Sequence, residues 1–147
     1  MDAFTANPAF RTYALCAAIL GLKMLFSAIY TGSRRQKHRG YINVEDGAVF
    51  GQGAAAAEQE APAVAHALRI QRNDLENIPL FFAIALIYVL LGASPFGAAV
   101  YCWTFTVARI AHTFFYTNHM QPWRALSFGV GALATVGMIV QIILAAL

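Results

Sequence analysis

Residues 69–91 read RIQRNDLENIPLFFAIALIYVLL, a polar third followed by an apolar remainder. No residue from Ile78 to Leu91 carries a charge. Together with the residues from about 63 onward, the stretch is long enough to cross a bilayer, which takes about 20 mostly apolar residues. Pro79 lies where the polar part ends, and it predicts a kink or local unwinding there. The stretch therefore predicts a membrane helix whose first third is polar.

Three more apolar runs accompany this one. They cover about residues 10–33, 96–117 and 124–147, and with 63–91 they predict four membrane-spanning helices. The segment 34–62 is the only long non-apolar part; its glycines predict a loop, with 54–60 as one place for a short surface helix. We expect an all-α integral membrane protein, a four-helix bundle formed by a single domain over residues 1–147.

The composition excludes several other classes of protein. Hydrophobic residues make up 59% of the 147 and charged residues 12%, whereas soluble domains are about half apolar and a quarter charged. Disorder needs the opposite balance. A net charge of +3 is too small to predict a nucleic-acid partner. Cys16 and Cys102 lie in apolar runs and are expected to be buried thiols, and no Cys/His cluster has metal-ligand spacing, so no metal is expected.

Basic residues predict the orientation in the membrane. They gather beside the first and third loops, and they are Arg34, Arg35, Lys37, Arg39, Arg69, Arg72 and Arg124. The positive-inside rule then places these loops in the cytoplasm and both termini away from it. No signal or retention motif is present, which leaves either a bacterial inner membrane or the endoplasmic reticulum.

Ionisable residues inside apolar spans usually face a polar cavity or a partner, because lipid does not solvate them. One set, at i, i+3, i+4 and i+7 of a helix, consists of Arg69, Arg72, Asn73 and Glu76. A second, at i, i+3 and i+7, consists of Arg109, His112 and Tyr116. Arg124 begins the last span and Arg35 ends the first, so all four helices bring polar groups to one level of the membrane.

The residue types at this depth of the membrane indicate what kind of ligand could bind there. Arginine is in excess, and its planar fork of donors binds carboxylates. Asn73 and Glu76 add acceptors that could hold an ammonium group. A small anion with more than one carboxylate and an amine fits, and glutathione, which also carries a thiol, is such a molecule.

Purely structural roles for the same residues remain possible. Arg34, Lys37 and Arg39 could be orientation anchors alone, and the 69–76 set could be an internal salt-bridge network. Arg109 could pair with an acid on a neighbouring helix. Lys23, the charge in the middle of the first span, could extend to the interface or pair with Glu76.

Several segments resemble the family of membrane-associated proteins in eicosanoid and glutathione metabolism (MAPEG). They are RNDLENI at 72–78, RIAHTFFY at 109–116 and RALSF at 124–128, with NVED at 43–46 and the weaker Lys23-Met24. They occur in the family's order over about residues 20–130. The chain looks most similar to the branch that holds microsomal glutathione transferase 1 and microsomal prostaglandin E synthase 1.

The resemblance implies a homotrimer with glutathione bound between subunits near the cytoplasmic side. Its implied glutathione-binding residues are Arg35, Arg69, Arg72, Asn73, Glu76, His112, Tyr116 and Ser127. Arg35 would come from the adjacent subunit. Arg124 is the implied catalytic residue, because a fixed positive charge beside the sulfur favours the thiolate. Asp46 and Arg109 are candidates to assist.

Two departures from the synthase pattern favour a general transferase. Ala125 stands where the synthase has serine, and Phe128 where it has tyrosine; Asp46, in contrast, matches the synthase, and the turn before Arg124 is one residue shorter. We expect conjugation of glutathione to hydrophobic electrophiles that arrive from membrane lipid, with reduction of lipid hydroperoxides as a second activity.

Three alternatives remain. They are a prostaglandin E synthase-like isomerase, a non-catalytic lipid-binding carrier of the same family, and a small transporter that uses Glu76. A carrier has little use for Arg72, Asn73 and Glu76 together with Arg124. The excess of arginine would repel the substrate of a cation exporter.

Overall fold

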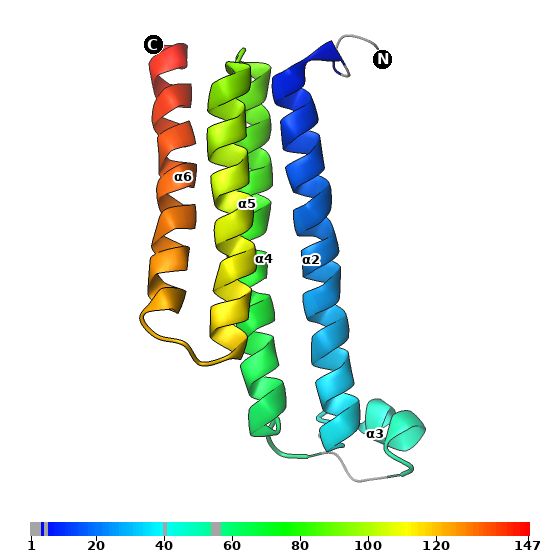
Figure 1. Cartoon of the computed structure of the whole chain (residues 1–147). Helices are drawn as coiled ribbons and strands as arrows, with labels where there is room; N and C mark the ends of the chain where they lie inside the picture. Colours follow the sequence, from blue (N-terminus) through cyan, green and yellow to red (C-terminus); the bar gives the residue numbers. More distant parts are fainter. Residues whose placement is uncertain (1–3, 5, 40, 54–56) are drawn as a thin grey trace. The chain divides into compact units, whose positions relative to one another are not determined.

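The computed structural model describes residues 4, 6–39, 41–53 and 57–147, and this part of the chain is helical without strands (Figure 1). The helices are α2 (Pro8–His38), α3 (Val44–Phe50), α4 (Pro62–Leu90), α5 (Pro95–Thr117) and α6 (Trp123–Ala146). The chain forms two compact units: unit 1 comprises Met1–Lys23 and Asp74–Leu147, and unit 2 comprises Met24–Asn73.

Three of the described helices, α2, α4 and α6, are long and apolar enough to cross a membrane. The expected fourth span, α5, has 23 residues but is not among them. Arg109 and His112 lie in the second half of α5 and lower its hydropathy. α4 is helical throughout, so Pro79 causes no local unwinding.

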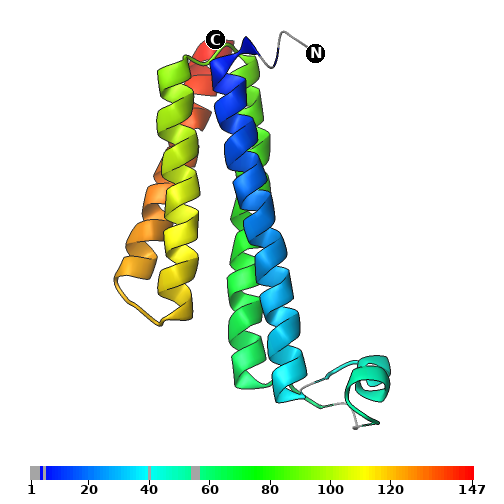
Figure 2. The ribbon, with the colours of Figure 1, turned by 45° about the vertical axis from the view of Figure 1, so that its right-hand side comes forward.

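In unit 1, α6 packs along α5 (Figure 1, Figure 2). The rings of Phe81 on α4 and Phe105 on α5 stack with centroids 4.1 Å apart. The hydroxyl of Tyr13 on α2 donates to the Phe82 carbonyl at 3.2 Å. Figure 1 places the start of α2 and the end of α6 at the same end of this unit. Unit 1 therefore brings polar residues of four different helices within reach of one another.

One local feature determines where α5 begins, and another determines how closely it packs against α6. Ser94 caps the helix, accepting a hydrogen bond from the Gly97 amide at 3.0 Å, and Pro95 follows at the first helical position. Gly137 of α6 faces Tyr101 so closely that a Cβ there would lie 2.5 Å from the ring. Cys16 and Cys102 are buried free thiols, as expected.

Unit 2 differs from the loop expected at 34–62. α2 continues to His38, and the cations Arg35 and Lys37 in its last turn interact favourably with the negative end of the helix dipole. The short helix is α3, which has two acids, Glu45 and Asp46, in its first turn. Residues 57–60, part of the stretch proposed as a surface helix, are not helical, and residues 54–56 lie outside the described part. Gly51 caps the end of α3, and only glycine fits there because a Cβ would lie 2.6 Å from the Gly47 carbonyl oxygen.

Candidate functional site

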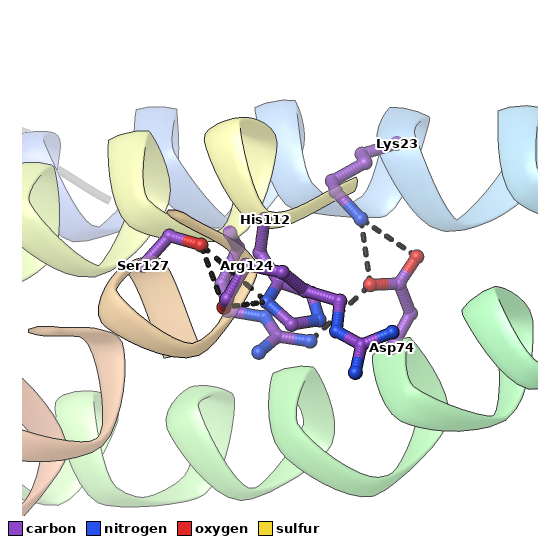
Figure 3. Close-up of polar contacts among 6 residues, drawn as sticks. Lys23, Asp74, His112, Arg124 and Ser127 are labelled. Carbon is purple, nitrogen blue, oxygen red and sulfur yellow. Dashed lines mark hydrogen bonds and ion pairs between the residues drawn. The ribbon is translucent and has the colours of Figure 1, made fainter. Parts of the chain in front are cut away.

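A buried group of three charges lies in unit 1 (Figure 3). Lys23 Nζ on α2 is 2.6 Å from both carboxylate oxygens of Asp74 on α4. Arg109 Nη2 on α5 is 3.5 Å from Asp74 Oδ1. The side chains of Asp74 and Arg109 are only 2% and 1% exposed. One carboxylate thus serves two cations, and the group carries a formal charge of +1.

The partner of Lys23 is therefore Asp74, and the expected pairing with Glu76 is wrong. Glu76 is exposed on α4. At about 100° per residue, Asp74 lies some 140° around the helix from Arg69, away from the face of the 69–76 set. For Arg109 the interpretation as the partner of an acid on a neighbouring helix is correct. A buried carboxylate between two cations is costly to disturb, because either partner left alone would be an uncompensated charge.

One helical turn from Arg109, His112 contacts the start of α6. Its Nδ1 lies 2.9 Å from the backbone carbonyl oxygen of Arg124. A carbonyl can only accept, so Nδ1 carries the proton and the neutral ring has a bare lone pair at Nε2. Ser127 Oγ donates to the same carbonyl at 3.0 Å. His112 is 4% exposed, and its Nε2 has no hydrogen-bond partner among the described residues.

The guanidinium of Arg124 lies over the ring of Tyr116, 4.5 Å from its centroid. This cation–π contact fixes the charge beside His112, whose ring is 5.7 Å from that of Tyr116. With its amide oxygen turned toward Arg124, Gln121 accepts from Nη2 at 2.6 Å and from Nε at 3.0 Å. Four predicted site residues, His112, Tyr116, Arg124 and Ser127, thus meet at the junction of α5 and α6.

The other predicted residues have different surroundings. Arg35 Nη2 in unit 2 pairs with Glu60 Oε1 at 2.7 Å. Asp46 accepts from Asn43 Nδ2 at 3.1 Å. Arg69 and Arg72 are exposed on α4, and Asn73 is half-buried.

Sequence reasoning did not select Asp74 as a site residue. It lies between Asn73 and Leu75, inside the RNDLENI segment at 72–78, but on a different face of the helix from Arg69 and Glu76. One signal could have found it: Lys23 lies inside an apolar span, and a lysine there needs an acid on a neighbouring helix.

The arrangement offers a fixed cation at the start of α6 and, from α5, a bare imidazole nitrogen that can accept a hydrogen bond. The cation can bind an anion and stabilise negative charge on an attacking atom, whereas the imidazole nitrogen can take an N–H of a bound ligand. A family model of the MAPEG family matches residues 13–144, nearly the whole chain. The chain belongs to the MAPEG family.

Relatives with assigned names agree with this membership. The MAPEG chain is 37% identical to microsomal glutathione S-transferase 1 of Homo sapiens over 132 residues, 88% of this chain and 85% of the relative. It is 32% identical to prostaglandin E synthase of Homo sapiens over 139 residues, 94% and 90% of the two chains. Prostaglandin E synthase of Bos taurus is 34% identical over 132 residues, 89% and 85%. This similarity, with three apolar helices, makes the chain an integral membrane protein, and the relatives named above are enzymes.

Proposed function

We propose that this MAPEG chain is a membrane-bound glutathione transferase, in which the glutathione thiolate attacks hydrophobic electrophiles. The observation that carries the proposal is the meeting of Arg124 with His112 and Tyr116, where a buried imidazole nitrogen has no partner in the described part of the chain. Buried polar atoms are nearly always paired in native proteins, so an orphan beside a fixed cation suits a bound ligand. The similarity to microsomal glutathione S-transferase 1 supports the choice of ligand.

Arg124 would activate the sulfur. An ordinary cysteine thiol has a pKa of about 8.5, so about 3% is thiolate at pH 7. Lowering this pKa by about 2 would raise the thiolate to about three quarters, and a cation within a few Å supplies that much energy. The thiolate then forms a bond to the electrophilic carbon, the leaving group departs with its electron pair, and the product is a thioether. His112 Nε2 would accept a hydrogen bond from a glutathione N–H.

The remaining parts of the proposal follow from the resemblance. Further glutathione contacts would come from Arg35, Arg69, Arg72, Asn73, Glu76 and Ser127, with Asp46 and Arg109 assisting. The working unit would be a homotrimer of four-span subunits, with α5 as the fourth span and Arg35 supplied by the adjacent subunit. The positive-inside rule, independently of the resemblance, would place both termini away from the cytoplasm, in a bacterial inner membrane or the endoplasmic reticulum.

The test uses the detergent-purified protein. Glutathione is added and the ultraviolet difference spectrum is recorded for thiolate, after which 1-chloro-2,4-dinitrobenzene is added and the conjugate is measured. We expect a thiolate band followed by conjugate. Binding of glutathione without a thiolate band or product would favour the lipid carrier. If glutathione did not bind at all, it would be ruled out as the ligand.

A pair of arginine variants makes this test specific. Arg124→Ala should lose the band and most of the turnover. Arg11→Ala removes an exposed arginine of α2 and should keep both. An unchanged Arg124→Ala would refute the role of Arg124 as activator.

Two related activities use the same thiolate. In the reduction of a lipid hydroperoxide, the thiolate would attack the outer oxygen, the O–O bond would break, and the alkoxide would leave and take a proton from water to give the lipid alcohol. The resulting glutathione sulfenic acid would react with a second glutathione thiol to give the disulfide and water. Isomerisation to prostaglandin E is the other, favoured by the similarity to prostaglandin E synthases and by Asp46. Product analysis with a hydroperoxide and with a prostaglandin endoperoxide separates both from conjugation.

A further inference from the structure

A groove of about 410 Å³ opens at one end of unit 1. Its walls are the last turn of α4, the connection 91–94, the first two turns of α5 and the end of α6, all at the end of the unit opposite the start of α6 (Figure 1). The volume lies within the usual range of small-molecule sites, about 300–1,000 Å³. Since a helix rises about 1.5 Å per residue, Gln141 in this groove lies about 25 Å along α6 from Arg124. The groove is therefore separate from the candidate site.

The lining of the groove is partly polar but carries no charge. All of the lining residues lie between 88 and 145, a range that the structure describes completely, and none of them is acidic or basic. Four carry hydroxyl or amide groups, and they are Tyr88, Ser94, Tyr101 and Gln141. The others are apolar or glycine. A charged ligand would find no counter-charge here, whereas an uncharged one with oxygen atoms and a hydrocarbon part matches both kinds of lining.

Two glycines make room for the tyrosine hydroxyls. A Cβ on Gly97 would lie 2.5 Å from the Tyr88 hydroxyl oxygen and 3.0 Å from Ser94 Oγ, so both hydroxyls lie beside the first turn of α5. A Cβ on Gly137 would lie 3.1 Å from the Tyr101 hydroxyl oxygen. The two tyrosine rings meet edge to face, with centroids 5.7 Å apart. The backbones of α5 and α6 therefore fix where the two tyrosine hydroxyls lie.

Three of these polar groups have no hydrogen-bond partner in the part of the chain that the structure describes. They are the hydroxyls of Tyr88 and Tyr101 and the amide of Gln141. Tyrosines that only anchor a helix at the membrane surface lie at the level of the lipid headgroups, but Tyr88 is 8% exposed. Gln141 is the one amide side chain of α6, and an amide in an apolar setting costs free energy unless it is hydrogen-bonded. Polar groups placed in this way indicate a bound molecule.

We propose that this groove binds an uncharged lipid whose polar end carries hydroxyl and ester oxygens, namely a monoacylglycerol. The tyrosine hydroxyls and the Gln141 amide would form hydrogen bonds with these oxygens. The acyl chain would leave the groove along Phe96 and Val100, which are 80% and 44% exposed. The carboxylate of a fatty acid or the phosphate of a phospholipid would lie there without a cation, so these lipids should bind more weakly. The site is independent of the proposed transferase activity.

The test uses a photoactivatable probe, 1-dodecanoylglycerol with a diazirine in the acyl chain next to the ester. The protein is studied in phosphatidylcholine nanodiscs, because the hydroxyls of sugar detergents would compete for the groove. After irradiation, peptide mass spectrometry locates the label. We expect saturable labelling within 88–101 and 141–145 that unlabelled 1-dodecanoylglycerol displaces. Methyl dodecanoate, which lacks the hydroxyls, and dodecanoate, which is charged, should displace the probe at least about tenfold more weakly, the loss of one or two hydrogen bonds.

Single variants test the hydrogen-bonding groups themselves. Tyr88→Phe and Gln141→Leu each remove one such group from the groove and should weaken displacement by unlabelled 1-dodecanoylglycerol about fivefold. Gln36→Leu makes the same change as Gln141→Leu at an exposed position of α2 in unit 2 and should match the wild type. Circular dichroism of each variant checks that it remains folded. Displacement as strong in both groove variants as in Gln36→Leu would contradict the assigned contacts.

Three results would overturn the proposal. Equal displacement by dodecanoate or methyl dodecanoate would show that the groove does not recognise the polar end of the lipid. Labelling that never saturates would show that the groove holds bulk lipid. A groove without any label would show that something else, such as a second copy of this chain, covers it. The conjugation assay with glutathione is separate, so none of these results would refute the transferase.

Discussion

Lys23 lies 2.6 Å from Asp74 and Arg35 lies 2.7 Å from Glu60, so the two ion pairs are equally short. Their surroundings differ: the side chains are 9% and 2% exposed in the first pair, and 36% and 15% in the second. A second cation, Arg109, shares Asp74 in the buried group. The comparison teaches that distance alone does not give the energy of an ion pair; burial decides what happens when one partner is lost.

Removal of the Asp74 charge should have the largest effect on stability. Asp74→Asn removes the carboxylate that Lys23 and Arg109 share, and we expect the breaking of this buried ion pair to cost about 3–5 kcal/mol. Thermal unfolding in detergent, followed by circular dichroism, measures the loss. Glu58→Gln, at an exposed loop position, removes the same charge and should change stability by less than about 0.5 kcal/mol.

A triple variant sharpens the comparison. Lys23→Met, Asp74→Leu and Arg109→Met together replace the charges by apolar side chains, and buried ion pairs often tolerate such replacement. We expect most of the stability lost in Asp74→Asn to return. A triple variant as unstable as Asp74→Asn would show that the cost is not one of unpaired charge.

The variant His112→Ala tests whether the polar group at the junction of α5 and α6 binds glutathione. His112→Ala removes the contact with the Arg124 carbonyl and the bare Nε2, and a lost hydrogen bond to a ligand costs about 1.5 kcal/mol, or roughly tenfold. Isothermal titration with glutathione should show affinity about tenfold lower. His119→Ala, at an exposed position in the turn after α5, is the matched control and should bind as the wild type does.

The exposed pair should give the smallest effect. Glu60→Gln removes the partner of Arg35 and is expected to cost at most about 1 kcal/mol, and less at high salt. Thermal unfolding at low and high salt measures this. A loss as large as that of Asp74→Asn would contradict the distinction between the two regions.

The sequence predicted the long helices well because hydrophobic runs and end signals are local. The expected 96–117 became Pro95–Thr117, with Ser94 and Pro95 as its start signal. The helix α3 was not predicted, since Gly47 and Gly51 argue for a loop and only the packing of one against the other explains them.

The candidate site was predictable in part for the same reason. Arg109, His112 and Tyr116 share a face by spacing alone, and Arg124 stood out as a charge at the start of an apolar run. The partner of Lys23 was not predictable. Asp74 and Glu76 lie close together in the sequence, and only tertiary packing decides which of the two faces Lys23. Nor does spacing reveal that His112 meets the backbone of Arg124 and not its side chain.

The most direct test of the account is a pH titration of the thiolate absorbance of glutathione bound to the wild type and to Arg124→Ala. A free thiol has a pKa of about 8.5. A thiol with a lowered pKa stays ionised as the pH falls, so the thiolate band of the wild type should persist well below that pH. In Arg124→Ala the midpoint should return toward that of the free thiol. A wild type whose bound glutathione titrates like free glutathione would contradict the claim that Arg124 stabilises the thiolate.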